Sequence, residues 1–472
     1  MKITFIRPHS TVQSAAPPMA FLSLSAYLRA LGNHQINIID GRAKLLDAEQ
    51  IKPLLQEERP DLIGITAFSL ERQEAHNLAS MAKSLYPQVP VVIGGPLPTS
   101  DWENTASDPN IDYAVLGEGE LTLQSLVESL EAGEKYPEIK GLAYKQNGEV
   151  RCFGFPDFIA DLDIIPMPAW DMIDLDFYFN NKLKRSSMNP HQKSSRSAPL
   201  ITTRGCPYQC TYCHNVFGKM LRKRSVESVI EEISYLKRAN NVEDIDIIDD
   251  IFNLDRERAK KICDRIVEEK LNIGIAFPNG LRVDQMDEEL VDKLKEAGCY
   301  RIVYAIETGE PAIQKAIKKR LNLKKAKNII DYTSKKGIST GGFFMLGFLD
   351  ETEEQMNMTV NFALKSKLHT AAFFVVQPFP KTELFEQAKK AGYKLDVHPQ
   401  DHYYHVTHNI SKVSTERINK IRGRAVRKFY FDPNRVIRFF RTTPVRHAFW
   451  TKILMILKFL FSNNPEKEGS SL

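Results

Sequence analysis

Short apolar runs alternate with longer amphipathic stretches along the first 145 residues. Strands are predicted where four or five apolar or β-branched residues follow one another, and helices where apolar residues recur every three or four positions. The expected strands cover residues 2–6, 35–39, 62–66, 91–93 and 113–116. The expected helices cover residues 19–31, 48–58 and 71–85, with one more after the last strand. Strict alternation predicts a parallel sheet covered on both faces, which is a doubly wound α/β domain over residues 1–145.

The alternation resumes from residue 199 to about residue 390. The expected strands cover residues 199–203, 243–249, 272–277, 300–306, 338–346 and 371–377, with helices such as 225–238 and 287–297 between them. Six such units predict a partial (β/α)6 barrel over residues 199–400, with reactive groups at the carboxyl ends of the strands. Residues 146–198 contain an Asn147-Gly148 hairpin turn, several prolines and a polar, serine-rich stretch, and are predicted to be a linker.

A doubly wound sheet binds its ligand at the carboxyl ends of its strands. Small and turn-forming residues stand at these ends in the first domain: Thr66, Ser69, Gly94, Gly95, Gly117, Glu118 and Gly119. Glycine at such positions lets the backbone approach a bulky ligand closely. No G-x-G-x-x-G motif follows the first strand, so a dinucleotide ligand is not favoured.

Three cysteines in a C-x3-C-x2-C arrangement follow the first barrel strand: Cys206, Cys210 and Cys213. Thiolates suit a [4Fe-4S] cluster, and three of them leave the fourth iron open for another ligand. Zinc is the main alternative, but a structural zinc site needs four ligands, and the adjacent His214 could complete one only with strained geometry. The other cysteines stand singly: Cys152, Cys263 and Cys299. Their scatter argues against a disulfide framework.

The cysteine motif, with Tyr212 directly before its third cysteine, resembles that of the radical S-adenosylmethionine (SAM) superfamily. The resemblance implies that SAM binds the open iron and is cleaved by an electron from the cluster to a 5′-deoxyadenosyl radical, which takes hydrogen from substrate. It also implies SAM contacts beside the cluster and at the barrel strand ends: Tyr212, Asp249, Arg282 and Glu307. The turn Gly347-Phe-Leu-Asp-Glu-Thr departs from the usual Gly-Phe-Pro-Gly-Glu-Thr of relatives.

The turns of the first domain resemble those of the cobalamin-binding domain that precedes many radical SAM barrels. They are Ile-Thr-Ala-Phe-Ser at 65–69, Ile-Gly-Gly-Pro at 93–96 and Gly-Glu-Gly-Glu at 117–120. The resemblance makes the seven strand-end residues named above cobalamin contacts. D-x-H-x-x-G is absent, and His9 lacks the flanking Asp and Gly, so the resemblance implies cobalamin with its own base detached and no histidine on cobalt. Leu97 stands where relatives often carry histidine.

Together these resemblances imply a cobalamin-dependent radical SAM enzyme that methylates an unactivated carbon of a small-molecule or lipid-like substrate. They imply a second SAM that remethylates cobalt and a reducing protein partner such as flavodoxin or ferredoxin. An oxidative cyclase resembling the anaerobic porphyrin-ring cyclase is the alternative among enzymes, and a non-catalytic cobalamin or redox sensor is the alternative from another class. A methylthiotransferase is disfavoured because residues 1–151 contain no cysteine.

Charge changes the picture at the C-terminus. The net charge of the chain is +5, yet residues 411–458 carry thirteen Lys or Arg against two acids. The apolar stretch 448–461, which includes Trp450, is too short to span a bilayer, since spanning takes about 20 residues. Region 401–472 is therefore predicted either to lie on an anionic membrane surface or to pack on the barrel. Nucleic acid is not an expected partner, because no recognised binding module accompanies the charge.

The overall composition is that of an ordinary globular protein, with 43% hydrophobic and 26% charged residues. The N-terminal sequence turns polar too early for a signal peptide. A cytoplasmic location is predicted, because an oxygen-sensitive cluster needs a reducing compartment. The basic tail adds a peripheral position at the inner membrane face as a second expectation.

Overall fold

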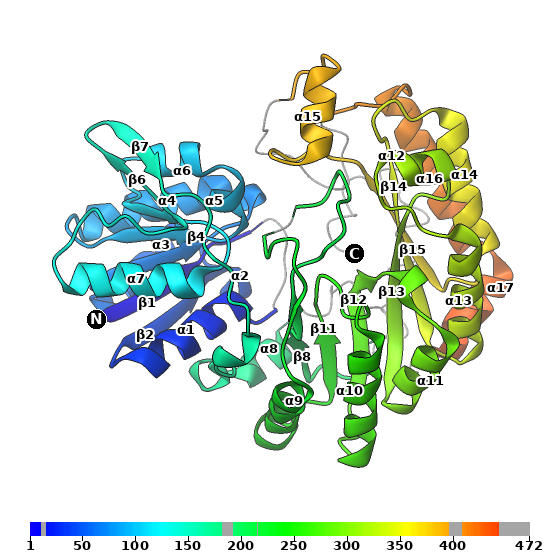
Figure 1. The fold of residues 1–472 in the computed structure, drawn as a ribbon, viewed down its shortest axis with the longest axis horizontal. Helices are drawn as coiled ribbons and strands as arrows, with labels where there is room; N and C mark the ends of the chain where they lie inside the picture. The colour runs from blue at the N-terminus through cyan, green and yellow to red at the C-terminus, as the bar shows by residue number, and fades with distance from the viewer. Residues whose placement is uncertain (11–15, 182–191, 215, 396–407, 443–472) are drawn as a thin grey trace. The chain divides into compact units, whose positions relative to one another are not determined.

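The computed structural model describes residues 1–10, 16–181, 192–214, 216–395 and 408–442. The chain divides into two compact units (Figure 1). The N-terminal unit is Met1–Ser186 with Asn215–Gly218, and the barrel unit is Ser187–His214 with Lys219–Leu472. The main passage from one unit to the other therefore falls near residue 187, inside the stretch predicted to be a linker.

A seven-stranded sheet with the order β2-β1-β3-β4-β5-β6-β7 forms the centre of the N-terminal unit. Its parallel strands are β1 (Lys2–Arg7), β2 (Gln35–Asp40), β3 (Leu62–Thr66), β4 (Val91–Gly94) and β5 (Tyr113–Val115). Strands β6 (Leu142–Gln146) and β7 (Glu149–Cys152) are antiparallel and form the predicted Asn147-Gly148 hairpin. The hairpin extends this sheet, whereas the sequence analysis had assigned most of it to the linker.

Helices cover both faces of this sheet (Figure 1). They are α1 (Met19–Leu31), α2 (Gly41–Lys44), α3 (Ala48–Glu58), α4 (Arg72–Leu85), α5 (Pro96–Ser100), α6 (Trp102–Ser107), α7 (Gly119–Glu131) and α8 (Leu175–Asn180). Phe5 packs with Phe21 of α1 on one face, and its neighbour Ile6 belongs to the core that includes Ile51 of α3 on the other. The predicted doubly wound arrangement is confirmed. The short helices α2, α5 and α6 were not predicted, because one or two turns leave too few positions for a period to show.

Six parallel strands in sequential order form the sheet of the barrel unit. They are β8 (Ser197–Leu200), β11 (Asp244–Ile247), β12 (Gly274–Leu281), β13 (Cys299–Glu307), β14 (Ser339–Leu346) and β15 (Thr370–Val375). This confirms the predicted partial (β/α)6 barrel. One detail is wrong: β12 continues past Phe277 through an irregular pairing with β13, so Asn279 and Gly280 lie within the strand and not after it.

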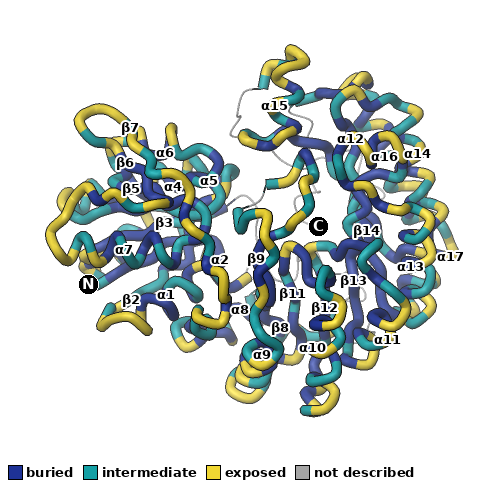
Figure 2. Tube along the Cα trace, viewed as in Figure 1, coloured by how far each residue is buried: buried dark blue, intermediate teal, exposed yellow. Residues whose placement is uncertain are grey.

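The helices of the barrel unit are α9 (Val226–Asn240), α10 (Arg256–Glu268), α11 (Glu288–Glu296), α12 (Pro311–Ala316), α13 (Leu323–Lys335), α14 (Glu353–Lys365), α15 (Glu383–Lys390), α16 (Thr415–Tyr430) and α17 (Pro433–Thr442). Most of them pack against the outer face of the sheet, while α15 lies beyond the carboxyl ends of the strands (Figure 1). The strands are mostly buried and the outer helix turns exposed (Figure 2). On β15, alternate residues are buried, such as Phe373 against Phe429 of α16, while their neighbours keep accessible surface. The inner face of the sheet is therefore the accessible one.

The described part of the basic tail packs on the barrel through α16 and α17. Ile418 and Phe429 are fully buried, and Arg435 donates hydrogen bonds to the carbonyls of Leu364 and Leu368. No helix among the described residues is long and apolar enough to cross a membrane. The apolar stretch 448–461 lies outside the described residues.

Candidate functional site

The three cysteines lie on the loop that connects β9 (Thr203–Arg204) to β10 (Arg222–Lys223), two short strands that pair with each other in antiparallel fashion. The loop is held at its middle by Thr211, which is buried. The Thr211 N–H donates to the carbonyl of Ile317 at 3.1 Å, and its own carbonyl accepts from the N–H of Leu384 at 2.8 Å. The Cys213 N–H donates to the Cys210 carbonyl at 3.2 Å, which tightens the turn between the two sulfurs.

The environment of the sulfurs favours a bound cation. Burial raises the pKa of the Cys206 thiol. Cys213 keeps an exposed surface, yet desolvation by the surrounding protein together with the charges of Cys210 and Cys206 raises the pKa of its thiol to about 12. Three neighbouring thiolates are therefore unfavourable without a metal that draws off their charge. Among the described residues no three side chains of metal-binding type already meet at one point. The fit to a [4Fe-4S] cluster thus lies in the donor set and in the loop that carries it.

The His214 side chain contacts residues 379 and 380 of the barrel unit. Its Nε2 atom lies 3.0 Å from the carbonyl oxygen of Pro380, and its ring packs edge-on against Phe379 at 5.5 Å. Burial lowers the pKa of His214. These contacts occupy the side chain that would have to complete a zinc site.

Tyr212 anchors the cysteine loop to the end of β13. Its ring packs 5.9 Å from that of Phe348, and its hydroxyl donates a hydrogen bond to Glu307. Burial, reinforced by the Glu307 charge, raises the pKa of Tyr212 well above its usual value. The structure thus joins two predicted site residues, Tyr212 and Glu307, in one contact.

Glu307 itself is held in an unusual conformation. It is the last residue of β13 and has φ +67, a left-handed conformation that few non-glycine residues adopt. Its Oε1 atom lies 3.3 Å from Nζ of Lys319, and both side chains are nearly buried. Lys319 was missed by the sequence analysis, because within Lys318-Lys319-Arg320 it reads as one charge of a solvated run.

Arg282 supports the other side of the loop. Its guanidinium stacks over the ring of Tyr208, which lies between the first two cysteines, at 3.6 Å from the ring centroid. The same group pairs with Asp284 at 2.8 Å and donates to the Lys319 carbonyl at 2.5 Å. Arg282 therefore lies close to the cysteine loop and is bound to protein partners there, and its SAM contact stays a prediction.

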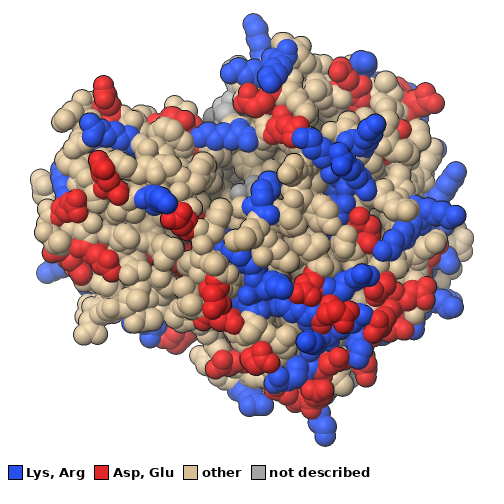
Figure 3. Space-filling model, in the orientation of Figure 1, with Lys and Arg blue, Asp and Glu red and all other residues tan. Residues whose placement is uncertain are grey.

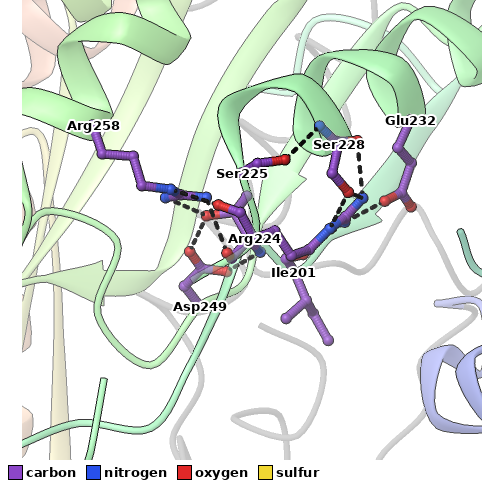
Figure 4. A network of polar contacts seen from close by, with 8 residues as sticks. Ile201, Arg224, Ser225, Ser228, Glu232, Asp249 and Arg258 are labelled. Carbon is purple, nitrogen blue, oxygen red and sulfur yellow. Dashed lines mark hydrogen bonds and ion pairs between the residues drawn. The ribbon is translucent and has the colours of Figure 1, made fainter. Parts of the chain in front are cut away.

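Asp249 belongs to a buried network beneath the loop (Figure 4). One of its carboxylate oxygens accepts from the Thr202 N–H and the other from the Thr202 hydroxyl, both at 2.6 Å. Arg258 donates to the Thr202 carbonyl at 3.1 Å, and Arg224 donates to the Ile201 carbonyl at 3.0 Å and pairs with Glu232. The network fixes residues 201–203, which lead into Cys206. The structure thus gives Asp249 a bracing role, and its SAM contact stays a prediction.

The neighbouring carboxylate, Asp250, was missed by the sequence analysis as a separate site residue. It is exposed and accepts a hydrogen bond from the N–H of Gly205, directly before Cys206. Surrounding protein raises the pKa of Asp250, while Gly205 and the cations Arg222 and Lys219 act in the opposite direction. An accessible carboxylate therefore stands beside the cysteine loop. Asp249 and Asp250 are neighbours in the sequence, and only the fold distinguishes the carboxylate that supports residues 201–203 from the accessible one.

The turn after β14 is closed by hydrogen bonds to a buried carboxylate. Asp350 takes φ +57, the left-handed conformation that a glycine adopts easily. Glu351 is fully buried, and its Oε2 atom accepts from the N–H groups of Gly347 at 2.7 Å and Phe348 at 3.0 Å. Burial, with the nearby Glu310 charge, raises the pKa of Glu351 to about 7, although the two N–H groups oppose the rise.

We expect Glu351 to make the barrel less stable as the pH rises. The folded carboxyl holds its proton more tightly than the unfolded one, whose pKa is 4.5. Stability should therefore fall between about pH 4.5 and pH 7 and stay constant above, by about 3 kcal/mol at about 1.4 kcal/mol per pKa unit. Glu351→Gln should remove this slope in urea unfolding followed from about pH 5 to pH 8. An equal slope in both proteins would contradict the assignment.

Four predicted cobalamin contacts lie together at the carboxyl edge of the N-terminal sheet. Thr66, Ser69, Gly94 and Gly95 are all partly exposed there. Gly94 leaves open space where a side chain would stand, since the nearest atom to an added Cβ is 4.0 Å away. Thr99, which the sequence analysis missed, donates to the Gly95 carbonyl at 2.8 Å and accepts from the Gly117 N–H at 2.9 Å. This edge can therefore admit a bulky ligand close to the backbone.

The other three predicted contacts have partners inside the domain. A Cβ on Gly117 would come within 3.0 Å of Pro156, and one on Gly119 within 3.2 Å of Leu24. Glu118 is buried and accepts from the N–H of Ile159 at 3.4 Å. Leu97 is fully buried in the core beside β4. Close packing thus accounts for these residues, and their contact with cobalamin stays a prediction.

The fold and the cysteine loop define a radical SAM protein with an N-terminal ligand-binding domain. The family description "Radical SAM superfamily" matches residues 200–363, and "B12 binding domain" matches residues 9–127. An uncharacterized methyltransferase of Pyrococcus horikoshii is 33% identical over 450 residues, covering 93% of this chain and 94% of the relative. The chain therefore belongs to the cobalamin-binding radical SAM family, whose cofactors are a [4Fe-4S] cluster, SAM and cobalamin.

Further relatives carry two different activities in their names. Cytidylyl-2-hydroxyethylphosphonate methyltransferase of Streptomyces wedmorensis is 29% identical, covering 80% of this chain and 76% of the relative. The anaerobic magnesium-protoporphyrin IX monomethyl ester cyclase of Rubrivivax gelatinosus is 25% identical, covering 86% and 73%. The structure of the radical SAM methyltransferase TsrM from Kitasatospora setae shares the fold, with a TM-score of 0.70 at 20% identity over 84% of this chain and 77% of that one.

Proposed function

We propose that this protein is a methyltransferase that adds a methyl group to an unactivated carbon of a small-molecule substrate. One observation carries the proposal: the chain matches a relative named a methyltransferase over nearly the full length of both proteins, cysteine loop included. When bound, the cluster supplies an electron to SAM, and cobalamin carries the methyl group. In the balanced reaction, two SAM molecules and two electrons from the reducing partner convert a carbon–hydrogen bond into a carbon–methyl bond. The first SAM leaves as methionine and as 5′-deoxyadenosine, which carries the hydrogen, and the second SAM leaves as S-adenosylhomocysteine.

The proposed roles of the residues follow from their contacts. Cys206, Cys210 and Cys213 hold iron, and the Tyr212–Glu307 hydrogen bond orients their loop. Arg282 fixes the loop from its other side by stacking on Tyr208. The buried carboxylate–lysine pair and the stacked arginine hold the loop rigid, which positions the reactants and excludes water from the radical.

Anaerobic purification with iron, sulfide and corrinoid analysis, followed by mass spectrometry of SAM-derived products, tests this function. A methyltransferase should release both 5′-deoxyadenosine and S-adenosylhomocysteine, and methyl-deuterated SAM should add a labelled methyl group to the product. A cyclase is the second candidate function, because the relative from Rubrivivax gelatinosus is named a cyclase. A cyclase should release 5′-deoxyadenosine without transferring the labelled methyl group. A protein that releases no 5′-deoxyadenosine would instead be a sensor of cobalamin or redox state.

The proposed partner is a reducing protein such as flavodoxin or ferredoxin, in the cytoplasm. On the face shown in Figure 3, Lys and Arg side chains gather over part of the barrel unit, with Asp and Glu side chains beside them. Complementary charge steers association between an acidic electron carrier and such a surface. Exchange of electrons with purified flavodoxin that weakens with added salt would support this partner.

We further infer that the C-terminal helices contact an anionic lipid surface. The outward faces of α16 and α17 combine exposed apolar and basic side chains: Arg424, Arg427, Lys428, Phe431, Val436, Ile437 and Arg441. Phe431 is 56% and Ile437 49% exposed, and Val436 beside them is exposed as well, so the apolar side chains are grouped. Basic residues beside exposed apolar ones suit the headgroup region of an anionic bilayer. The apolar sequence 448–461 follows this surface along the chain.

Reversal of two charges should weaken this contact without unfolding the barrel. Because each basic residue near an anionic surface contributes about 1 kcal/mol, Arg427→Glu with Lys428→Glu should reduce binding to phosphatidylglycerol vesicles at least about tenfold. Lys389→Glu with Lys390→Glu makes the same charge change on the exposed end of α15 and serves as the control. Equal losses in both proteins, or no vesicle binding by the unaltered protein, would contradict the inference. Point variants are preferable to deletion of residues 411–472, because α16 supplies buried core residues.

A further inference from the structure

The N-terminal sheet has a topological switch point between β1 and β3. From β1 the chain goes to β2 on one side, and from β3 it goes to β4 on the other. In sheets of this type the ligand binds in the crevice outside the carboxyl ends of the two central strands. The loop after β3 therefore faces the ligand, and its second residue is Phe68.

Phe68 presents an aromatic ring at this crevice. It is 49% exposed, while Ala67 directly before it and residues 62–65 of β3 are buried. Thr66 and Ser69 on either side are partly exposed and polar. A Cβ on Gly95, whose φ is +96, would come within 2.8 Å of Thr66 Oγ1, so the loops after β3 and β4 pack directly against each other. The exposed ring is therefore next to two loops that are packed together without a gap.

The ring is held in place from beneath. The Phe68 N–H donates to Glu71 Oε2 at 3.1 Å. Glu71 forms a nearly buried ion pair with Arg42, and the Arg42 guanidinium lies 5.5 Å from the centroid of the Phe68 ring. A cation under one face of a ring attracts it electrostatically, which leaves the other face for the ligand.

The charged groups nearest the crevice are engaged with one another. Arg7 at the end of β1 donates to the Ala16 carbonyl at 2.7 Å and pairs with Asp40 at 3.4 Å. Tyr178 donates to the same Asp40 carboxylate at 2.9 Å. These contacts leave Phe68 as the large apolar surface that the loop after β3 offers to the ligand. A flat, largely apolar ligand face fits this surface better than a phosphate does.

We propose that Phe68 packs against the lower face of the corrin ring of cobalamin and occupies the place of a lower axial ligand. The inference rests on the proposed function, in that it takes cobalamin as the ligand of this domain. A phenyl ring has no lone pair to donate to cobalt. Cobalt therefore receives no protein ligand on this side, and the ring blocks the return of the cofactor's own base.

Phe68→His tests this placement by putting a metal ligand where the phenyl ring stands. The unaltered protein, loaded with cobalamin and reduced to the cobalt(II) state, should show an electron paramagnetic resonance spectrum without nitrogen splitting. Phe68→His should show a nitrogen triplet, which becomes a doublet when the protein carries ¹⁵N-histidine. The isotope distinguishes the new histidine from the cofactor's own base.

Tyr136→His is the matched control, because Tyr136 is another exposed aromatic residue of this unit and lies beyond the end of α7, at the opposite edge of the sheet. It should leave both the spectrum and the cobalamin affinity unchanged. Phe68→Ala should weaken cobalamin binding about tenfold, the equivalent of one aromatic packing contact. Full cobalamin binding by Phe68→His without nitrogen splitting, together with unweakened binding by Phe68→Ala, would overturn the inference. Failure of the unaltered protein to bind cobalamin would instead refute the proposed function.

Discussion

Cys210→Ala is expected to abolish both the visible absorbance of the iron–sulfur cluster and the cleavage of SAM. Cys210 is the middle one of the three cysteines on this loop. Without it, two thiolates remain, and two are too few to hold a [4Fe-4S] cluster of which three irons need a cysteine ligand. The loss should exceed any change that a positioning residue produces, because the electron donor to SAM is gone. Iron and sulfide analysis of the reconstituted protein and chromatography for 5′-deoxyadenosine measure the two effects.

The same variant should keep cobalamin bound, because the N-terminal unit holds it on a separate sheet. Cys152→Ala is the matched control, since Cys152 is partly exposed on β7 and lies far along the chain from the loop. It should retain the full iron content and SAM cleavage. SAM cleavage retained by Cys210→Ala would contradict the assignment of the cluster to this loop.

Arg224→Ala is expected to destabilise the barrel unit by about 3–5 kcal/mol. The change removes the guanidinium that compensates Glu232, whose side chain is fully buried, and a buried charge left behind is strongly unfavourable. It also removes the donor to the Ile201 carbonyl, at the start of the segment that leads into the cysteine loop. Denaturant unfolding of the barrel transition, followed by circular dichroism, measures the loss.

Arg256→Ala supplies the comparison for this prediction. Arg256 pairs with Asp287 at 2.8 Å, but both side chains are substantially exposed, so the pair should contribute only about 0–1 kcal/mol. Glu232→Leu combined with Arg224→Met should recover much of the loss, because an apolar pair needs no compensation. A loss from Arg224→Ala as small as that from Arg256→Ala would show that the network in Figure 4 contributes little.

Most of the fold was predictable because its strands are buried on both faces or regularly alternating. The runs at 62–66 and 91–93 are continuous and apolar, and the structure has β3 and β4 there. The end of β12 was not predictable, because Pro278-Asn279-Gly280 is typical of a turn and only pairing with β13 keeps it in the sheet. The antiparallel pairing of the β6–β7 hairpin with β5 was not predictable either, because it depends on contacts between residues that are distant in sequence.

The kind of cofactor at the site was predictable from the sequence, but the role of each individual residue was less so. The three cysteines stand out because three thiols within eight residues, without a fourth cysteine nearby, suit a [4Fe-4S] cluster better than a structural zinc site. Asp249 and Asp250 look alike in sequence, and only the hydrogen bonds of Thr202 mark the first as a brace. Phe68 could not be distinguished from a core residue, because its exposure depends on the turn that Glu71 closes.

The anchoring of Thr211 sets an order on the maturation of the protein. The cysteines belong to the first barrel loop, yet the carbonyl of Ile317 and the N–H of Leu384 that hold this loop come more than a hundred residues later. A nascent chain that has released only the motif cannot have these supports in place. Iron loading should therefore follow completion of the sheet, and premature termination before residue 384 should yield a chain that takes up iron poorly.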